Sequence, residues 1–176
     1  MIQTQLTWQD VEKQIQELCR KLQLDQWYPD YIVGLTKGGL VPATMMAHYL
    51  NCRMETLNVS LRDSGVGPES NLWMAEDAFG YSEGKSHPEL RKNILIVDDI
   101  NDSGATLDWI RQDWLSGCMP KDPAWNTIWG DNVRVATLYN NASSKSITRV
   151  TYTAKEINKR QRDEWIVFPW ESWWTA

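Results

Sequence analysis

The stretch NILIVDDINDSGAT, residues 93–106, decides the fold. Its first seven residues, Asn93 to Asp99, form a continuous aliphatic run that ends in two acids. Such a run is typical of a strand that is buried on both faces of a parallel sheet. A polar loop follows it, and a helix is predicted from about Ala105 to Leu115. We therefore expect a central parallel strand whose carboxyl end opens into a polar loop.

The chain on either side repeats this order of strand, loop and helix. Before it, the pattern predicts a capped helix from Thr7 to about Leu24, a strand at 31–36, a glycine loop, a helix at 41–50 and a strand at 54–61. After it, strands are predicted at 133–139, 149–153 and 165–168. Strands that alternate with helices indicate an α/β domain with a mainly parallel sheet. We expect one domain, 1–176, with about five strands flanked by helices.

Two segments stand apart from this pattern. Residues 62–92 are polar and weakly patterned, so a long mobile loop that acts as a lid is predicted there. Residues 140–176 are expected to form a small hood and a base-binding segment, with part of the N-terminus as a candidate second component. Four of the 11 tryptophans lie in the last dozen residues. A packed tail or a dimer surface is the plain interpretation of Trp170, Trp173 and Trp174.

Composition excludes several classes of protein. The 176 residues are 42% hydrophobic and 23% charged, with a net charge of −5, which argues against a disordered tail or a basic nucleic-acid module. No apolar run of about 18 residues and no signal-peptide pattern is found, so we expect a cytoplasmic protein without a membrane span. Three scattered cysteines and two histidines are poor material for a zinc site or a Ser-His-Asp triad.

The polar loop after the central strand has the chemistry of a phosphate site. Open α/β sheets bind ligands at the carboxyl ends of their strands, and the free N–H groups of a helix N-terminus suit a phosphate. Hydroxyls at Ser103 and Thr106 add donors, and Gly104 lets the backbone approach closely. The adjacent acids Asp98 and Asp99 are costly unless they meet hydroxyls or a hard cation, which favours a sugar diol with Mg²⁺. An acidic cap on an ordinary helix is the alternative.

The aliphatic strand, the acid pair and the loop Asp102-Ser103-Gly104-Ala105-Thr106 together resemble the signature of the type I phosphoribosyltransferase family. The resemblance implies that this loop grips the 5-phosphate of phosphoribosyl pyrophosphate (PRPP). It also implies that Asp98 and Asp99 hold the ribose hydroxyls and Mg²⁺. Asp102 would face N7 of a purine and act as the general base or proton relay. The implied fold is a parallel sheet with a C-terminal hood.

Two further runs resemble the xanthine-guanine and hypoxanthine members of that family. The run GLTKGGLVP, residues 34–42, is similar to their pyrophosphate loop, which implies contacts from Thr36, Lys37, Gly38 and Gly39 and a cis peptide at Thr36–Lys37. The run WIVFPWE, residues 165–171, is similar to their base-binding hood. It implies that Trp165 stacks on the base, that Ile166 offers backbone groups to it, and that Glu171 helps to hold the magnesium.

One departure from these relatives leaves the identity of the accepted base undetermined. Where these relatives carry a lysine that donates to the 6-oxo group of a purine, this chain has Asn141. An amide can donate to an oxo group or accept from an amino group, so a 6-oxopurine is favoured while adenine or a non-purine acceptor stays open.

The resemblance implies a purine phosphoribosyltransferase, a glycosyltransferase of purine salvage, that works as a homo-oligomer, either dimer or tetramer. The alternative is a regulatory protein of the same fold that binds PRPP or a nucleotide without transferring it. Such a protein could use a local basic strip formed by Lys155, Lys159, Arg160 and Arg162, which is otherwise a solvated helix face. Turnover distinguishes the two.

Overall fold

A five-stranded parallel sheet forms the centre of the computed structural model, which describes residues 1–59, 61, 67–118 and 126–175. The strand order is β3-β2-β6-β7-β8. The strands are β2 (Tyr31–Leu35), β3 (Arg53–Leu57), β6 (Ile94–Asn101), β7 (Val133–Asn141) and β8 (Tyr152–Ile157). The predicted aliphatic strand is therefore the third of five, and its central position is confirmed.

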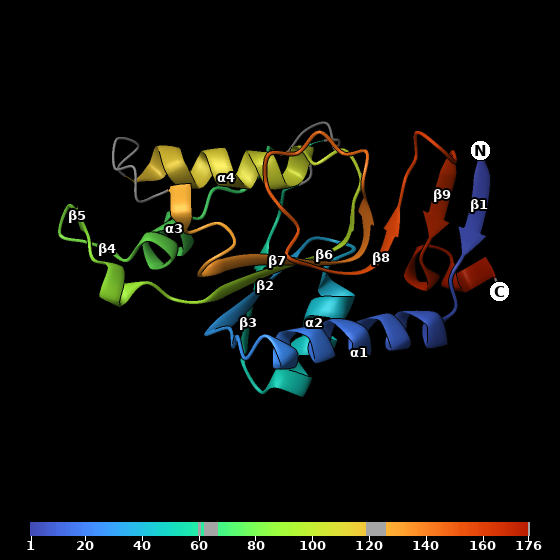
Figure 1. The fold of residues 1–176 in the computed structure, drawn as a ribbon, viewed down its shortest axis with the longest axis horizontal. Coiled ribbons are helices and arrows are strands. Elements are labelled where there is room, and N and C mark those ends of the chain that lie inside the picture. Colours follow the sequence, from blue (N-terminus) through green and yellow to red (C-terminus); the bar gives the residue numbers. More distant parts are fainter. Residues whose placement is uncertain (60, 62–66, 119–125, 176) are drawn as a thin grey trace.

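Helices cover both faces of this sheet (Figure 1). The helices α1 (Trp8–Leu24) and α2 (Leu40–Leu50) pack on one face, and α3 (Leu72–Phe79) and α4 (Ala105–Gly117) pack on the other. Side chains of β6 alternate between the two cores: Leu95 and Val97 face α1 and α2, whereas Ile94 and Ile96 face α3 and α4. All four are fully buried, which is the reason that the sequence of this strand is aliphatic without interruption.

Local signals set the helix ends as predicted. Thr7 caps α1, because its hydroxyl accepts from the Asp10 N–H while the Asp10 carboxylate accepts from the Thr7 N–H at 2.9 Å. The helix ends at Leu24. Helix α2 follows the glycine loop, and Asn51, in the left-handed conformation, closes it.

A second sheet joins the two ends of the chain. Strand β1 (Ile2–Gln5) pairs in parallel with β9 (Glu164–Val167), with Ile2 opposite Glu164 and Gln5 opposite Val167. Figure 1 shows this pair beside β8 with both termini next to it. The pair is the core of the expected C-terminal hood, and the N-terminus supplies its second strand. A short 3₁₀ turn, Pro169–Glu171, follows β9, and another spans Trp173–Thr175.

The structure corrects the expectation of an unpatterned segment at 62–92. Helix α3 buries Met74, Ala75, Ala78 and Phe79, and a hairpin of β4 (Tyr81–Ser82) and β5 (Lys85–Ser86) and a 3₁₀ turn at Pro88–Leu90 follow it. Eight residues are too few for a clear helical period among polar neighbours, so the sequence hides this helix. Residues 62–66 lie outside the described part, and the lid stays a prediction.

Two strand boundaries were also wrong. β3 ends at Leu57 instead of residue 61, and β8 spans Tyr152–Ile157 instead of 149–153. Both are edge strands of the sheet, and a single neighbour determines which of their residues pair. In the described ranges, no helix combines the length and the apolar character needed to cross a membrane.

Candidate active site

The sheet places two loops at one ligand-binding edge. The chain leaves β2 toward β3 on one side and leaves β6 toward β7 on the other, so the strand order changes direction between β2 and β6. In open α/β sheets, such a switch point forms a crevice at the carboxyl ends of the strands. A cavity of about 300 Å³ lies there. Its wall includes Thr36, Asp98, Asp99, residues 102–106, Lys159, Trp165, Ile166 and Glu171.

The glycine loop after β2 lies directly against the carboxyl end of β6. A side chain at Gly38 would overlap the carboxylate of Asp99, and one at Gly39 would overlap the carbonyl of Val97. The Thr36–Lys37 peptide is cis, as the resemblance implied. Thr36 lines the cavity and its hydroxyl bonds to Asn58 at 3.1 Å, whereas Lys37, Gly38 and Gly39 are not in the cavity wall of this structure.

The acid pair at the end of β6 is arranged by the backbone. The N–H of Asp99 donates to Oδ1 of Asp98 at 2.9 Å, and the N–H of Ile100 donates to Oδ1 of Asp99 at 2.7 Å. Burial raises the pKa of Asp98 well above its usual range, and the charge of Asp99 raises it further. Burial also raises the pKa of Asp99, and Glu171 adds to this rise. A site that raises the pKa of two carboxylates is suited to a cation or to hydroxyl donors.

The loop into α4 is shaped for an anion. Gly104 has φ +87°, and a side chain there would overlap Ser146. The Ser103 hydroxyl accepts from the N–H of Ala105 at 3.3 Å. The first N–H groups of any α-helix lack intrahelical partners, which suits this end of α4 to an anion. Asp108 holds the segment behind this loop, because its carboxylate accepts from Ser146 Oγ at 2.7 Å and from the Thr148 N–H at 3.0 Å.

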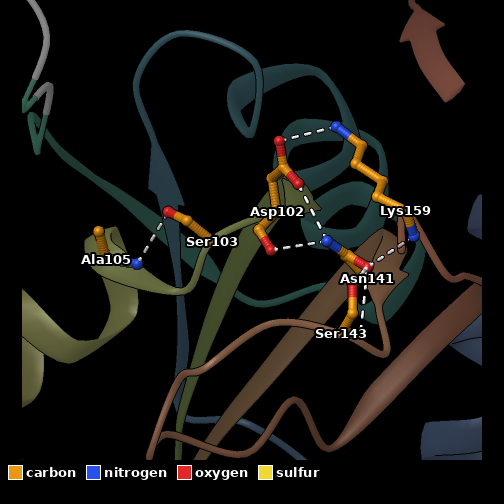
Figure 2. A network of polar contacts seen from close by, with 6 residues as sticks. All are labelled: Asp102, Ser103, Ala105, Asn141, Ser143 and Lys159. Atoms are coloured by element: carbon orange, nitrogen blue, oxygen red, sulfur yellow. Dashed lines mark hydrogen bonds and ion pairs between the residues drawn. The ribbon is translucent and has the colours of Figure 1, made fainter. Parts of the chain in front are cut away.

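Asp102 lies between two donors (Figure 2). Lys159 Nζ is 2.7 Å from its Oδ2, and Asn141 Nδ2 is 3.2 Å from its Oδ1 and 3.2 Å from its carbonyl oxygen. The Asn141 side-chain oxygen accepts from the N–H and the hydroxyl of Ser143 and from the backbone N–H of Lys159. Asp102 is therefore held from two separate segments, the end of β7 and the connection between β8 and β9.

The hood supplies the opposite wall of the cavity. Trp165 is 40% exposed, and the ammonium of Lys159 lies 5.4 Å from the centre of its ring. Ile166 is buried beside it. One Glu171 oxygen accepts from the N–H of Phe168 at 2.7 Å, which fixes the carboxylate at the cavity. Phe168 stacks on Trp170 with ring centres 4.8 Å apart, so Trp170 packs within the hood as expected.

Eleven of the 15 predicted site residues meet at this cavity. They are Thr36, Asp98, Asp99, Asp102, Ser103, Gly104, Ala105, Thr106, Trp165, Ile166 and Glu171. Asn141 is not in its wall: it is buried behind Asp102, and its amide is used by protein groups. The sequence prediction of Asn141 as a contact to the base therefore lacks support from its position.

Lys159 is the site residue that sequence reasoning missed. The expected solvated helix is absent, because Lys155 lies in β8, while Lys159, Arg160 and Arg162 lie in the connection to β9. A cation six residues before the hood tryptophan is the only signal in the sequence, and distance along the chain alone does not place it in the cavity.

Three carboxylates of the cavity wall could hold a metal. Asp98, Asp99 and Glu171 offer the oxygen ligands that Mg²⁺ prefers. Within the described residues, no three His, Cys, Asp or Glu side chains are grouped closely enough to enclose a metal by themselves. This donor set fits a magnesium ion that takes one or two carboxylates and completes its shell with water and phosphate oxygens.

Comparisons with known proteins agree with this geometry. The xanthine-guanine phosphoribosyltransferase of Roseobacter denitrificans is 27% identical over 177 residues, which cover 94% of this chain and 84% of that protein. The enzyme of the same name from Cereibacter sphaeroides is 28% identical, over 94% of this chain and 85% of that protein.

Solved structures share the fold. The purine phosphoribosyltransferase from Pyrococcus horikoshii superposes with a TM-score of 0.64 at 24% identity, over 97% of this chain and 94% of that one. The Helicobacter pylori xanthine-guanine-hypoxanthine phosphoribosyltransferase superposes with a TM-score of 0.66 at 19% identity, over 98% and 96%. The family model of the phosphoribosyl transferase domain matches residues 3–174, and the chain therefore belongs to the phosphoribosyltransferase family.

Proposed function

We propose that this protein is a purine phosphoribosyltransferase that transfers phosphoribose from Mg²⁺-PRPP to a purine base, with a 6-oxopurine favoured, and releases pyrophosphate and a nucleoside monophosphate. One observation carries the proposal. A single cavity joins an anion loop, a pair of acids and an exposed aromatic ring, which are the groups that a phosphate, a ribose and a flat base require. The names of the relatives support the purine as acceptor.

The parts of PRPP are assigned to three elements. The first turn of α4, with Ser103 and Thr106, binds the 5-phosphate, because residues 103–106 line the cavity and the N–H groups of a helix start favour an anion. Asp98 and Asp99 accept hydrogen bonds from the ribose hydroxyls. The glycine loop at 36–39 binds the pyrophosphate through backbone N–H groups, and Lys37 adds a positive charge.

The reaction develops positive charge on the ribose. The carboxylates of Asp98, Asp99 and Asp102 stabilise this charge, since preformed charges act strongly in a cavity from which water is excluded. Asp102 also accepts the proton that leaves the purine nitrogen, as a general base or relay. Trp165 covers one face of the base and holds it in line with the ribose.

Magnesium is proposed as the cation of this site, held by Asp98, Asp99 and Glu171 together with PRPP. When bound, it neutralises the charge that develops on the leaving pyrophosphate. The protein's own groups orient the ribose and the base, and they exclude water.

The experiment that tests this function measures pyrophosphate release from Mg²⁺-PRPP with xanthine, guanine, hypoxanthine and adenine in turn, with base-free and EDTA-treated reactions as controls. We expect base-dependent release with at least one oxopurine. If none of the four bases gives pyrophosphate release while calorimetry shows that PRPP binds, the regulatory alternative or a non-purine acceptor is favoured instead. The homo-oligomer and the cytoplasmic location remain predictions.

A further inference from the structure

Lys159 brings a positive charge to the base-binding side of the cavity. Among the described residues of the cavity wall it is the one lysine or arginine. Its side chain is 20% exposed, its ammonium pairs with Asp102 at 2.7 Å, and the same ammonium lies over the Trp165 ring, 5.4 Å from its centre. A base that stacks on this face of Trp165 therefore meets the ammonium.

An ammonium group can only donate hydrogen bonds to the edge of a base. It carries three N–H donors and no acceptor, and Asp102 takes one of the donors. The remaining donors are satisfied by an exocyclic oxygen of the base. An exocyclic amino group in the same place would set donor against donor and leave the charge without a partner, which is costly in a partly buried site.

Asn141 does not compete for this role. Its NH₂ group is given to Asp102 and its oxygen to Ser143 and to the backbone N–H of Lys159. Figure 2 shows Lys159 and Asn141 bonded to different oxygens of the Asp102 carboxylate. Asn141 is thus a positioning residue: it holds the Lys159 backbone and the Asp102 carboxylate, and it leaves the base to the lysine.

We propose that Lys159 determines the specificity for the base by donating to an exocyclic oxygen of an oxopurine stacked on Trp165, and that Asn141 positions Lys159 for this contact. The inference rests on the proposed function and assigns the choice of oxopurine over aminopurine to a residue outside β7. Lys159 also keeps the Asp102 carboxylate paired while the base site is empty.

Nucleotide binding tests this proposal without turnover. We would measure the dissociation constants of inosine 5′-monophosphate and of purine ribonucleoside 5′-monophosphate, which has hydrogen in place of the oxygen, by calorimetry. The proteins are the wild type, Lys159→Met and the control Arg160→Gln, which removes an exposed positive charge next to the site. For Lys159→Met, we expect inosine monophosphate to bind about tenfold to a hundredfold more weakly, while the nucleotide without the oxygen changes less than about twofold. Arg160→Gln should bind both like the wild type.

Kinetics provide the second readout. In Lys159→Met the KM for hypoxanthine should rise by a similar factor, with the KM for PRPP unchanged. Equal binding of inosine monophosphate by wild type and Lys159→Met would overturn the proposal, as would an equal loss for both nucleotides or a similar loss in Arg160→Gln. If the wild type binds neither nucleotide, the proposed function itself fails, and the inference fails with it.

Discussion

The carboxylate of Asp99 occupies the space that a side chain at Gly38 would need. Gly38 belongs to the turn after β2 and Asp99 to the carboxyl end of β6, so the contact joins the glycine loop to the acid pair, of which Asp99 lines the cavity. A Cβ at residue 38 would have to displace the Asp99 carboxylate, so the side chain of a neighbouring strand, and not the conformation of a turn, favours glycine there.

Gly38→Ala is therefore expected to displace Asp99 and to weaken the binding of Mg²⁺-PRPP by at least about tenfold, measured by calorimetry. Gly67→Ala is the matched control, since no atom lies within 4 Å of a Cβ there. Unchanged affinity in Gly38→Ala would show that Asp99 does not touch PRPP.

Asp102→Asn should lower turnover by about 10²–10⁴-fold and leave PRPP affinity nearly intact, because the amide has the size of the carboxylate but cannot accept a proton. Lys159 and Asn141 both donate to Asp102, so the amide oxygen keeps one of these hydrogen bonds and the other is lost. Pyrophosphate release gives the turnover, and calorimetry gives the affinity. An unchanged kcat would remove Asp102 from the proton transfer.

The raised pKa of Asp98 predicts that the unfolding free energy of the ligand-free protein falls as pH rises. Burial raises the pKa of Asp98 in the folded chain, so folding favours the protonated acid, and this contribution is complete below the unfolded pKa of about 4. It is lost as pH rises through the raised folded pKa. Asp98→Asn should thus stabilise the ligand-free protein by about 1 kcal/mol or more at about pH 8.

Thermal melts at about pH 4 and about pH 8 test this sign, and the gain should be confined to the higher pH. Glu12→Gln, at an exposed position of α1, is the control and should show little change at either pH. The same Asp98→Asn variant should bind Mg²⁺-PRPP more weakly, so stability and function are expected to move in opposite directions. A gain of equal size at both pH values would contradict the burial argument.

The lowered pKa of Asp108 predicts the opposite: its contribution to the unfolding free energy decreases as pH falls. Burial raises its pKa, but hydrogen bonds from Ser146 and Thr148 outweigh burial and lower it overall. Its contribution is present above the unfolded pKa of about 4 and is lost as pH falls through the lowered folded pKa. Asp108→Asn should cost about 1–3 kcal/mol of unfolding free energy at neutral pH, measured by urea titration.

This variant should also weaken the grip on the 5-phosphate, because Ser146 supports the backbone at Gly104. Asp113→Asn on the same helix, whose carboxylate accepts from Ser70 at the surface, should have a smaller effect on stability and none on PRPP binding. If Asp108→Asn and Asp113→Asn change the unfolding free energy and the PRPP affinity equally, the segment behind Gly104 does not support PRPP binding.

Trp165→Ala should raise the KM for the base by about tenfold to a hundredfold and change the KM for PRPP little, since stacking of one base on an aromatic ring is worth about 1–3 kcal/mol. Trp173→Ala is the control, because Trp173 is 68% exposed and lies outside the cavity wall. If both variants behave alike, the base does not stack on Trp165.

Local sequence signals account for much of the fold. The uninterrupted aliphatic run at 94–97 predicts a strand buried on both faces, and Thr7 with Asp10 predicts the start of α1. The loop from Asp102 to Thr106 carries the resemblance to the family within five consecutive residues. These features depend on a few neighbouring residues, so they can be predicted without knowledge of the rest of the chain.

Tertiary structure decided how distant segments meet. Lys159 and Asp102 are 57 residues apart, and their contact depends on the path of β7, β8 and the connection to β9. The same path leaves Asn141 outside the cavity wall, and the pairing of β1 with β9 completes the hood. The sequence by itself determined the parallel sheet, the family and the loop at 102–106 that we propose binds the phosphate. The packing of strands around the cavity determined that Lys159 is the cation in its described wall, because no local propensity encodes a contact between side chains that lie far apart in the chain.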